Sequence, residues 1–274
     1  MIKFSALILV YNKEKPEYFY EALNSLIKQT RKPSEIVIVK DGRLTEKLEN
    51  VITKFLDETK GVKVKMISLG ENIGSGGASA IGVKACSYEY IARLDSDDIA
   101  NENRFELQAE LFEKEPMLDI VSGYIEEFSE AMDGRTHIRK VPVTGKEISQ
   151  YIKYKSPFNH PAVMYKKSSI IRIGNYNALR KMEDYDLWIR AVKNNLNCYN
   201  IPEILTRVRI GNNTYKKRGG IKYICTIVNI QNKLKDNDMI TIKEEMKNIF
   251  FRTVVALMPW KLRRCVYWKF LREI

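Results

Sequence analysis

The first part of the chain alternates apolar runs with amphipathic stretches. Residues 4–10 are continuously apolar, and the segment that opens near Pro16 repeats apolar side chains at helical spacing. The repeated positions are Phe19, Leu23, Leu26 and Ile27. Further strands are predicted at 35–39, 62–67 and 90–94, and further helices at 44–56 and 78–86. Strands alternating with helices predict a mostly parallel sheet wound through right-handed crossovers.

Beyond Asp119 the pattern becomes mixed. Strands are predicted at 120–128, 136–141, 162–165, 198–201 and 205–210, the first two as a hairpin across Met132-Asp133-Gly134. Helices are predicted at 146–153, 182–194, 219–235, 240–257 and 260–272. We therefore expect an α/β domain over residues 1–215 and a helical extension over residues 216–274.

Polar side chains follow the predicted strands of the first half. Tyr11, Asp41, Asn72 and Asp95 each lie just beyond a strand end. In open parallel sheets, ligands bind beyond the carboxyl ends of the strands. We therefore expect these four residues to meet in one cleft.

Three carboxylates, Asp95, Asp97 and Asp98, occupy four consecutive positions at the end of the 90–94 strand. Like charges this close repel unless a cation or a hydrogen-bonding ligand holds them. Hard oxygen ligands suit Mg²⁺ or Mn²⁺, particularly when substrate phosphates complete the coordination. The alternative is that Asp98 or Ser96 only caps the helix that begins near Asn101.

Charge is distributed unevenly. Residues 216–274 contain 14 Lys and Arg against 5 Asp and Glu, so they carry +9 of the net +12. This distribution favours one localised anionic partner over a surface that coats nucleic acid. Residues 260–272 mix basic and large aromatic side chains, which is typical of a helix in the headgroup region of an anionic membrane. Alternatively, this helix packs its aromatic side chains on the domain.

Three features of the sequence bear on the cellular compartment. The four cysteines form no metal-type pair, which favours a reduced cytosolic compartment. The N-terminus enters a strand at once, so no signal peptide is expected, and no apolar run approaches the ~20 residues of a membrane span. We expect a protein that is soluble or bound to a membrane surface.

Five motifs occur in order along the chain: Leu9-Val10-Tyr11-Asn12, Lys40-Asp41-Gly42, Asn72-Ile73-Gly74, Asp95-Ser96-Asp97-Asp98 and Glu183-Asp184-Tyr185-Asp186-Leu187-Trp188. Over residues 4–210 this series resembles the family 2 glycosyltransferases of GT-A fold, especially bacterial O-antigen and capsule sugar transferases. The resemblance implies an inverting enzyme that moves a hexose from a UDP-sugar to a growing surface polysaccharide unit. It also implies an acceptor on undecaprenyl diphosphate, and a cytoplasmic location on the inner face of the plasma membrane. Residues 1–115 would bind the nucleotide sugar and residues 116–215 the acceptor.

The resemblance assigns the nucleoside to Tyr11 and Asp41, with Asn72 beside them. Tyr11 would line the base pocket, and Asp41 can accept a hydrogen bond from the ring N–H of uracil. The alternatives are a half-buried core aromatic for Tyr11 and a plain Asp-Gly turn for Asp41-Gly42.

On the diphosphate side, the resemblance makes Asp97 a direct ligand of Mn²⁺ or Mg²⁺, with Asp95 reaching the ribose or the metal through water. Ser96 lies within the same donor-binding motif. Arg93 either touches the phosphates or pairs with one of the aspartates. Arg209 stands where many relatives carry a metal-ligating His, and an Arg there can neutralise the diphosphate directly.

On the acceptor side, the resemblance makes Asp184 the general base and gives Glu183 the task of holding the acceptor or orienting the base. His160 is assigned to an acceptor-contacting loop, although a structural role is equally open. We expect Asp186 to face another side of its helix.

Two other functions, a nucleotidyltransferase and a non-catalytic binding module, are alternatives. A nucleotidyltransferase usually needs a glycine-rich, basic loop after the first strand, and Tyr11-Asn12-Lys13-Glu14-Lys15 contains no glycine. A non-catalytic membrane or RNA-binding module would use the basic tail but would leave the Asp cluster and Glu183-Asp184 unexplained.

Overall fold

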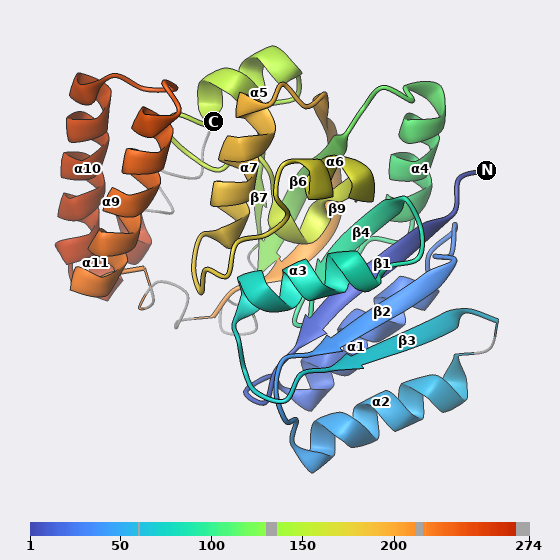
Figure 1. The fold of residues 1–274 in the computed structure, drawn as a ribbon. Helices are drawn as coiled ribbons and strands as arrows, with labels where there is room; N and C mark the ends of the chain where they lie inside the picture. Colours follow the sequence, from blue (N-terminus) through green and yellow to red (C-terminus); the bar gives the residue numbers. More distant parts are fainter. Residues whose placement is uncertain (60, 130–135, 212–215, 217, 267–274) are drawn as a thin grey trace.

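One nine-stranded mixed sheet organises the molecule (Figure 1). The structure, a computed structural model, describes residues 1–59, 61–129, 136–211, 216 and 218–266. The strand order is β3-β2-β1-β4-β8-β6-β9-β5, with β7 paired to the carboxyl-terminal part of β6. The predicted α/β class is thus confirmed.

The first half is the predicted strand–helix alternation. Its strands are β1 (Phe4–Val10), β2 (Glu35–Lys40), β3 (Lys63–Ser68) and β4 (Tyr90–Asp95), all parallel to their neighbours in this group. Its helices are α1 (Pro16–Ile27), α2 (Glu46–Glu58) and α3 (Ser75–Ala85). Helices α1 and α2 cover one face of the sheet and α3 the other (Figure 1).

Local chemistry sets the helix starts. Pro16 opens α1, where its missing N–H costs nothing. The Thr45 side chain accepts from the Leu48 amide, so α2 begins at residue 46 rather than at the expected 44. Helix α3 begins earlier than expected, at Ser75, directly after Gly74 with its φ of 88°.

The second half runs from the Asp cluster to residue 211. Its strands are β5 (Ile99–Ala100), β6 (Ile120–Phe128), β7 (Thr136–Arg139), β8 (Met164–Lys166) and β9 (Cys198–Arg209). Its helices are α4 (Arg104–Lys114), α5 (Gly145–Tyr151), the 3₁₀ turn η1 (His160–Ala162), α6 (Lys167–Arg172) and α7 (Glu183–Lys193). The turn expected at Met132-Asp133-Gly134 lies outside the described residues.

The two strands expected at 198–201 and 205–210 are in fact one strand, β9. It pairs in parallel with β6, and the register shifts between Gly123 and Ile125. At this shift Pro202 and Glu203 have no pairing partner on β6, which suits a proline because it offers no N–H to the ladder. Because β6 and β9 run in the direction of β1–β4, their carboxyl ends reach the edge of the sheet where β4 ends.

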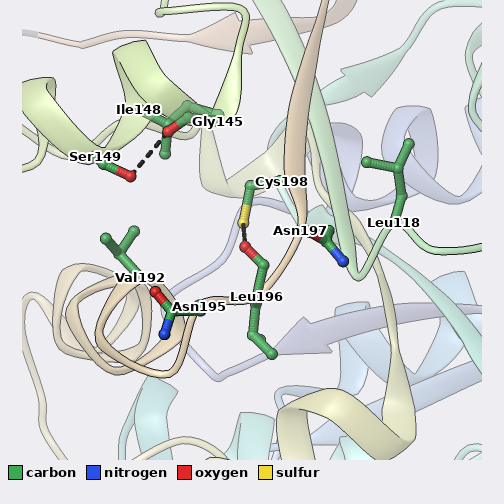
Figure 2. A pocket seen from close by; sticks show the side chains of 9 residues that line it. All are labelled: Leu118, Gly145, Ile148, Ser149, Val192, Asn195, Leu196, Asn197 and Cys198. Atoms are coloured by element: carbon green, nitrogen blue, oxygen red, sulfur yellow. Dashed lines mark hydrogen bonds between the residues drawn. The ribbon is translucent and has the colours of Figure 1, made fainter.

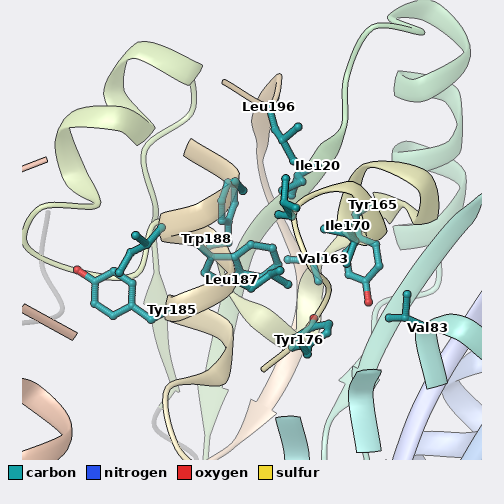
Figure 3. Packing of buried hydrophobic residues seen from close by; sticks show 14 of the residues in the cluster. Val83, Ile120, Val163, Tyr165, Ile170, Tyr176, Tyr185, Leu187, Trp188 and Leu196 are labelled. Carbon is teal, nitrogen blue, oxygen red and sulfur yellow. The ribbon is translucent and has the colours of Figure 1, made fainter. Parts of the chain in front are cut away.

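Helix α7 is anchored in the core that lies on the α3 face of the sheet. In Figure 3, Leu187 and Trp188 point from α7 into the cluster around Val163 and Ile120. Trp188 is completely buried, and its ring packs edge-on against Phe158 with centroids 5.0 Å apart. Leu187, Trp188 and Ala191 of α7 are buried, and Val192 is partly buried.

The C-terminal extension consists of α9 (Ile221–Asp236), α10 (Ile242–Leu257) and α11 (Trp260–Val266). Helix α9 lies beside α7, and α10 lies beyond α9 on the outside of the molecule (Figure 1). The helix expected at 260–272 is described only as far as residue 266. Among the described residues, no helix is both long and apolar enough to cross a membrane.

The glycine-rich start of α3 packs against protein. A Cβ on Gly76 would lie 2.1 Å from the Asn177 carbonyl oxygen and 2.7 Å from that of Leu179. The Gly76 amide donates to the Leu179 carbonyl at 3.2 Å. The glycine thus joins α3 to the segment that leads into α7.

Replacing Gly76 by Ala should therefore lower the free energy of unfolding by about 1–3 kcal/mol through overpacking. Urea denaturation followed by circular dichroism measures this. Gly70→Ala is the matched control, because no atom lies within 4 Å of a Cβ there. Equal stabilities of the two variants would contradict the packing role of Gly76.

Candidate active site

The end of β4 is fixed by two buried arginines. Arg93 forms an ion pair with Asp95, which decides one of the alternatives left open by the sequence. Arg104 of α4 donates from Nη2 to the Arg93 carbonyl at 2.7 Å. Burial alone would raise the pKa of Asp95, but the Arg93 guanidinium holds it below its usual value. Asp95 is therefore ionised and oriented before any ligand binds.

Asp97 and Asp98 are not neutralised to the same extent. Burial, together with the charges of Asp95 and Glu14, raises the pKa of Asp97 to about 7. Burial and the neighbouring aspartates also raise the pKa of Asp98 well above its usual value. Too many negative charges are gathered here for the cations around them.

The helix-capping alternative is wrong. Helix α4 begins at Arg104, not near Asn101, and its N-cap Asn103 makes no side-chain capping bond. Asp98 instead accepts a hydrogen bond from the Arg209 amide at 2.9 Å, and Ser96 donates to Glu14 at 2.7 Å. The Asp motif thus ties the end of β4 to the end of β9.

The carboxylates fit a divalent ion that is shared with a ligand. Among the described residues, no group of three or more His, Cys, Asp and Glu is gathered as a metal cage. Mg²⁺ typically uses one or two carboxylates and takes its remaining ligands from water and substrate phosphates. Asp97, with its raised pKa, and Asp95 match that smaller donor set.

Arg209 lies at the border of the Asp cluster. Its guanidinium sits over the Tyr18 ring at 3.8 Å and the Phe128 ring at 4.7 Å from the centroids. Its Nε donates to the Asp97 carbonyl at 3.3 Å, and its Nη2 pairs with Glu21. The predicted diphosphate contact of Arg209 would have to draw it from Glu21.

Asp41 does more than form a turn. One carboxylate oxygen accepts from the Ile73 amide at 2.8 Å, and the other from Asn72 Nδ2 at 2.9 Å and the Gly74 amide at 3.1 Å. Gly42 has a φ of 85°, and a Cβ there would lie 2.8 Å from the Asn72 amide nitrogen. Asp41 therefore holds the 72–74 loop at the end of β2.

Tyr11 is partly buried just beyond the end of β1. Burial raises the pKa of its hydroxyl, and the charges of Glu14 and Asp97 add to the rise. Tyr11 is thus brought near the Asp cluster, as expected. The nucleoside contacts of Tyr11, Asp41 and Asn72 stay predictions.

Glu183 and Asp184 are the first two residues of α7. Met182, immediately before them, has a φ of 56°, a left-handed conformation that is unfavourable for a residue with a side chain. Burial raises the pKa of Asp184, Arg139 and Arg93 oppose the rise, and Asp95 adds to it. Burial and Asp184 raise the pKa of Glu183. The charges of Arg93 and Asp95 thus both act on the Asp184 carboxyl.

His160 is integrated into the core. Its Nε2 hydrogen-bonds with the Tyr176 hydroxyl at 2.9 Å, and its ring lies edge-on to Trp188. Burial and the charge of Arg93 lower its pKa well below the usual value, so the imidazole is neutral at pH 7. These contacts favour the structural interpretation, and an acceptor contact stays a prediction.

Asp186 turns away from the cleft, as expected, but it has a role that sequence reasoning missed. Its carboxylate accepts from Asn177 at 2.7 Å and from Arg190 at 2.8 Å, and it pairs with Lys233 of α9. The i,i+4 spacing of Asp186 and Arg190 was the available signal. Lys233, 47 positions away, gave none.

A cavity of about 370 Å³ lies away from these residues (Figure 2). It lies between α5, the end of α7 and the start of β9. Its lining residues include Ile148, Val192 and Cys198. Because it faces the amino end of β9, it is not the site where the motifs meet.

Comparison with known proteins decides the family. Residues 5–174 match the family described as glycosyl transferase family 2. The chain belongs to this family. It is 36% identical over 271 residues to the UDP-Gal:α-D-GlcNAc-diphosphoundecaprenol β-1,3-galactosyltransferase of Escherichia coli, covering 99% of this chain and 97% of that protein. It is 34% identical over 271 residues to the amylovoran biosynthesis glycosyltransferase AmsE of Erwinia amylovora, covering 97% and 98%.

Solved glycosyltransferase structures share the fold. Residues 1–349 of S. aureus TarS in complex with UDP-GlcNAc superpose with a TM-score of 0.67 at 18% identity, over 97% of this chain and 75% of that one. The mannosyltransferase PcManGT of Pyrobaculum calidifontis, solved with GDP-Man and Mn²⁺, gives 0.64 at 11% identity, over 92% and 69%. The fold is GT-A and the protein is a glycosyltransferase. Neither the nucleotidyltransferase nor the non-catalytic module is retained.

Asp186→Asn should lower the free energy of unfolding by about 2 kcal/mol at pH 7, because Lys233 and Arg190 lose their buried anionic partner. Burial alone would raise the pKa of Asp186, but its bonds to Lys233 and Arg190 hold it below the usual value. Its contribution is therefore present above the unfolded pKa of about 3.9 and is lost as the pH falls through the lower folded value.

Urea denaturation at pH 7 and below pH 4 measures the difference, which should shrink at the lower pH. Asp236→Asn, an exposed carboxylate on α9, is the matched control. A loss that is independent of pH would contradict the ionic role of Asp186.

Proposed function

We propose that this protein is an inverting glycosyltransferase that moves a hexose from a UDP-sugar to a lipid-linked saccharide of a bacterial surface polysaccharide. The observation that supports the proposal is that two groups of carboxylates, Asp95-Ser96-Asp97 at the end of β4 and Glu183-Asp184 at the start of α7, both interact with the charge of Arg93. The first group suits a metal-bound diphosphate, and the second suits an acceptor hydroxyl.

The proposed donor lies along the carboxyl ends of β1, β2 and β4. Tyr11 lines the base, and Asp41, whose two oxygens offer about four acceptor positions, uses its remaining one for the uracil N–H. Asp95 is oriented by Arg93 toward the ribose or the metal. Because the E. coli relative is named for UDP-Gal, UDP-galactose is the first donor to test.

Asp97, with Asp95, would hold Mn²⁺ or Mg²⁺ against the donor diphosphate. When bound, the ion supplies positive charge to the diphosphate as UDP leaves. The support is the excess of negative charge at Asp97 and the fold shared with a mannosyltransferase solved with Mn²⁺. Arg209 adds a fixed positive charge at the same border.

Asp184 acts as the general base. Its carboxylate takes the proton of the acceptor hydroxyl, and the freed oxygen attacks the anomeric carbon from the side opposite the diphosphate. The bond from that carbon to the phosphate oxygen breaks, so UDP leaves and the configuration inverts. Burial raises the pKa of Asp184, which makes the carboxylate a better proton acceptor. Glu183 orients the acceptor or the base, and His160 borders the acceptor.

The acceptor is proposed to be linked to undecaprenyl diphosphate, because the E. coli relative is named for such a substrate. This places the enzyme in the cytoplasm, peripheral on the inner face of the plasma membrane. The basic 260–272 region is then expected to contact the anionic membrane surface. No nucleic acid is involved.

Asp184→Asn should lower kcat roughly 10²–10⁴-fold, the usual contribution of a general base. The Kd for UDP should stay unchanged, because Asp184 is assigned to the acceptor side. Initial rates with UDP-galactose and a GlcNAc-diphospholipid, together with calorimetric titration of UDP, measure both quantities. Asp57→Asn on the surface of α2 is the control. Unimpaired transfer would remove Asp184 from this role.

Asp97→Asn should weaken UDP binding in the presence of Mn²⁺ at least roughly tenfold. A chelator should weaken wild-type binding to a similar degree and should add little to the effect of the substitution. Calorimetry with UDP, with Mn²⁺ and with a chelator makes the comparison, and Glu17→Gln on α1 is the control. If the wild-type protein showed no saturable UDP binding with Mn²⁺, the proposed donor would be wrong.

A further inference from the structure

Helix α10 turns its polar side toward the protein. Glu245 is buried and pairs with Lys235 of α9 at 3.1 Å. Asn248 donates to Gln231 of α9 at 2.9 Å and to the Lys153 carbonyl at 3.1 Å. The inner face of this helix is thus held by hydrogen bonds and an ion pair.

The outer face of α10 is apolar. Six of the fifteen exposed large hydrophobic side chains in the described part of the chain lie on this one helix. They are Ile242, Met246, Phe250, Phe251, Val254 and Leu257. All but Phe251 follow one another at intervals of three or four residues, which aligns them on a single face. Met246 is 66% exposed and Phe250 is 64% exposed.

Contacts at both ends of α10 fix the orientation of this helix. Thr241 and Glu244 form a reciprocal capping box that fixes the start of α10. At the other end, Arg263 of α11 donates to the Val255 and Ala256 carbonyls. Turning the apolar side inward would bury it against Lys235 and Gln231 and would break every polar contact of the inner face.

The outer side of the helical extension also carries cationic side chains among the apolar ones. Lys243 and Lys247 are exposed on α10 itself, and Lys261 and Arg264 are exposed on α11. The two acidic residues of α10 are committed elsewhere, Glu244 to the cap and Glu245 to Lys235. Exposed apolar side chains together with Lys, whose long stem lets its charge reach the headgroups, suit a helix that lies in the interface of an anionic membrane.

We propose that the outer face of α10 is a docking surface that inserts into the headgroup region of an anionic lipid bilayer. The charge argues against a second copy of the chain as the occupant, because two segments that each carry +9 would face each other. The proposal concerns a surface distinct from the active site and does not depend on which sugar is transferred.

The position of α10 suits an enzyme with a membrane-held substrate. The Gly220 amide, at the start of α9, donates to the Ala256 carbonyl near the end of α10 at 3.2 Å. Strand β9 ends beside the Asp cluster, and the chain enters α9 only twelve positions after Arg209. The carboxyl end of α10 therefore lies on the same side of the fold as the strand ends that form the site (Figure 1).

Vesicle flotation of the full-length protein tests the proposal. The probes are vesicles of phosphatidylcholine alone and of phosphatidylcholine mixed with phosphatidylglycerol. The wild-type protein should float with the anionic vesicles. The Met246→Gln/Phe250→Gln variant should lower the ratio of bound to free protein at least roughly tenfold, because it replaces two apolar side chains that would be buried in the bilayer. Lys243→Gln/Lys247→Gln should lower it several-fold, and only on the anionic vesicles.

Matched controls are Met117→Gln and Lys47→Gln, which alter exposed residues elsewhere and should float like the wild type. Equal flotation of all variants, or none by the wild type, would overturn the proposal. So would a lipid-free dimer that Met246→Gln/Phe250→Gln converts to a monomer in sedimentation velocity, because a second copy would then cover the face.

Transfer to a water-soluble acceptor analogue separates this proposal from the proposed function. Met246→Gln/Phe250→Gln should leave that activity unchanged, because both side chains are exposed on the outer face of α10 and neither belongs to the proposed site. A wild-type protein that floats with anionic vesicles but transfers no sugar would support the docking surface and contradict the proposed function.

Discussion

The fold depends on the buried guanidinium of Arg104. It donates to the carbonyls of Arg93, Pro161 and Val163, and so joins β4 to the η1 turn. Its Nη1 also reaches the Thr206 hydroxyl of β9 at 3.3 Å. Burial lowers its pKa to about 9, so it stays charged at pH 7. One buried cation thus links β4 to the η1 turn and to β9.

That cation also sets the electrostatic state of the candidate site. The charges of Arg93 and Arg104 act on Asp95 and Asp98, so two buried cations are set against the three carboxyl groups of the Asp cluster. Asp95 is satisfied by Arg93, whereas the pKa of Asp97 rises to about 7. The imbalance costs stability in the protein alone and is relieved when positive charge arrives. A divalent ion that enters with a diphosphate meets this requirement, since the protein does not gather a complete cage for it among the described residues.

The sequence predicted what depends on local pattern. Apolar runs located β1–β4 and β6, and the five motifs indicated the family and its fold. What it could not predict depends on long-range contacts. Arg104 looks like any charged residue at a helix start, yet it is completely buried because backbone carbonyls of β4 and of the η1 turn, together with the Thr206 hydroxyl, converge on it. Likewise, the bonding of Asp41 to the 72–74 loop depends on a partner more than thirty positions away.

Helix α10 shows why a correct helix prediction leaves function open. Its period of 3.6 residues predicts two faces but does not say which one turns inward. The answer comes from its neighbour α9, which presents Gln231 and Lys235 to α10 and Lys233 to Asp186 of α7. Because α9 is bonded on one side to the helix that carries Asp184, the outward direction of the apolar face is fixed relative to that carboxylate. A docking surface built in this way would set both the distance and the tilt of the site above a membrane, which positive charge alone cannot do.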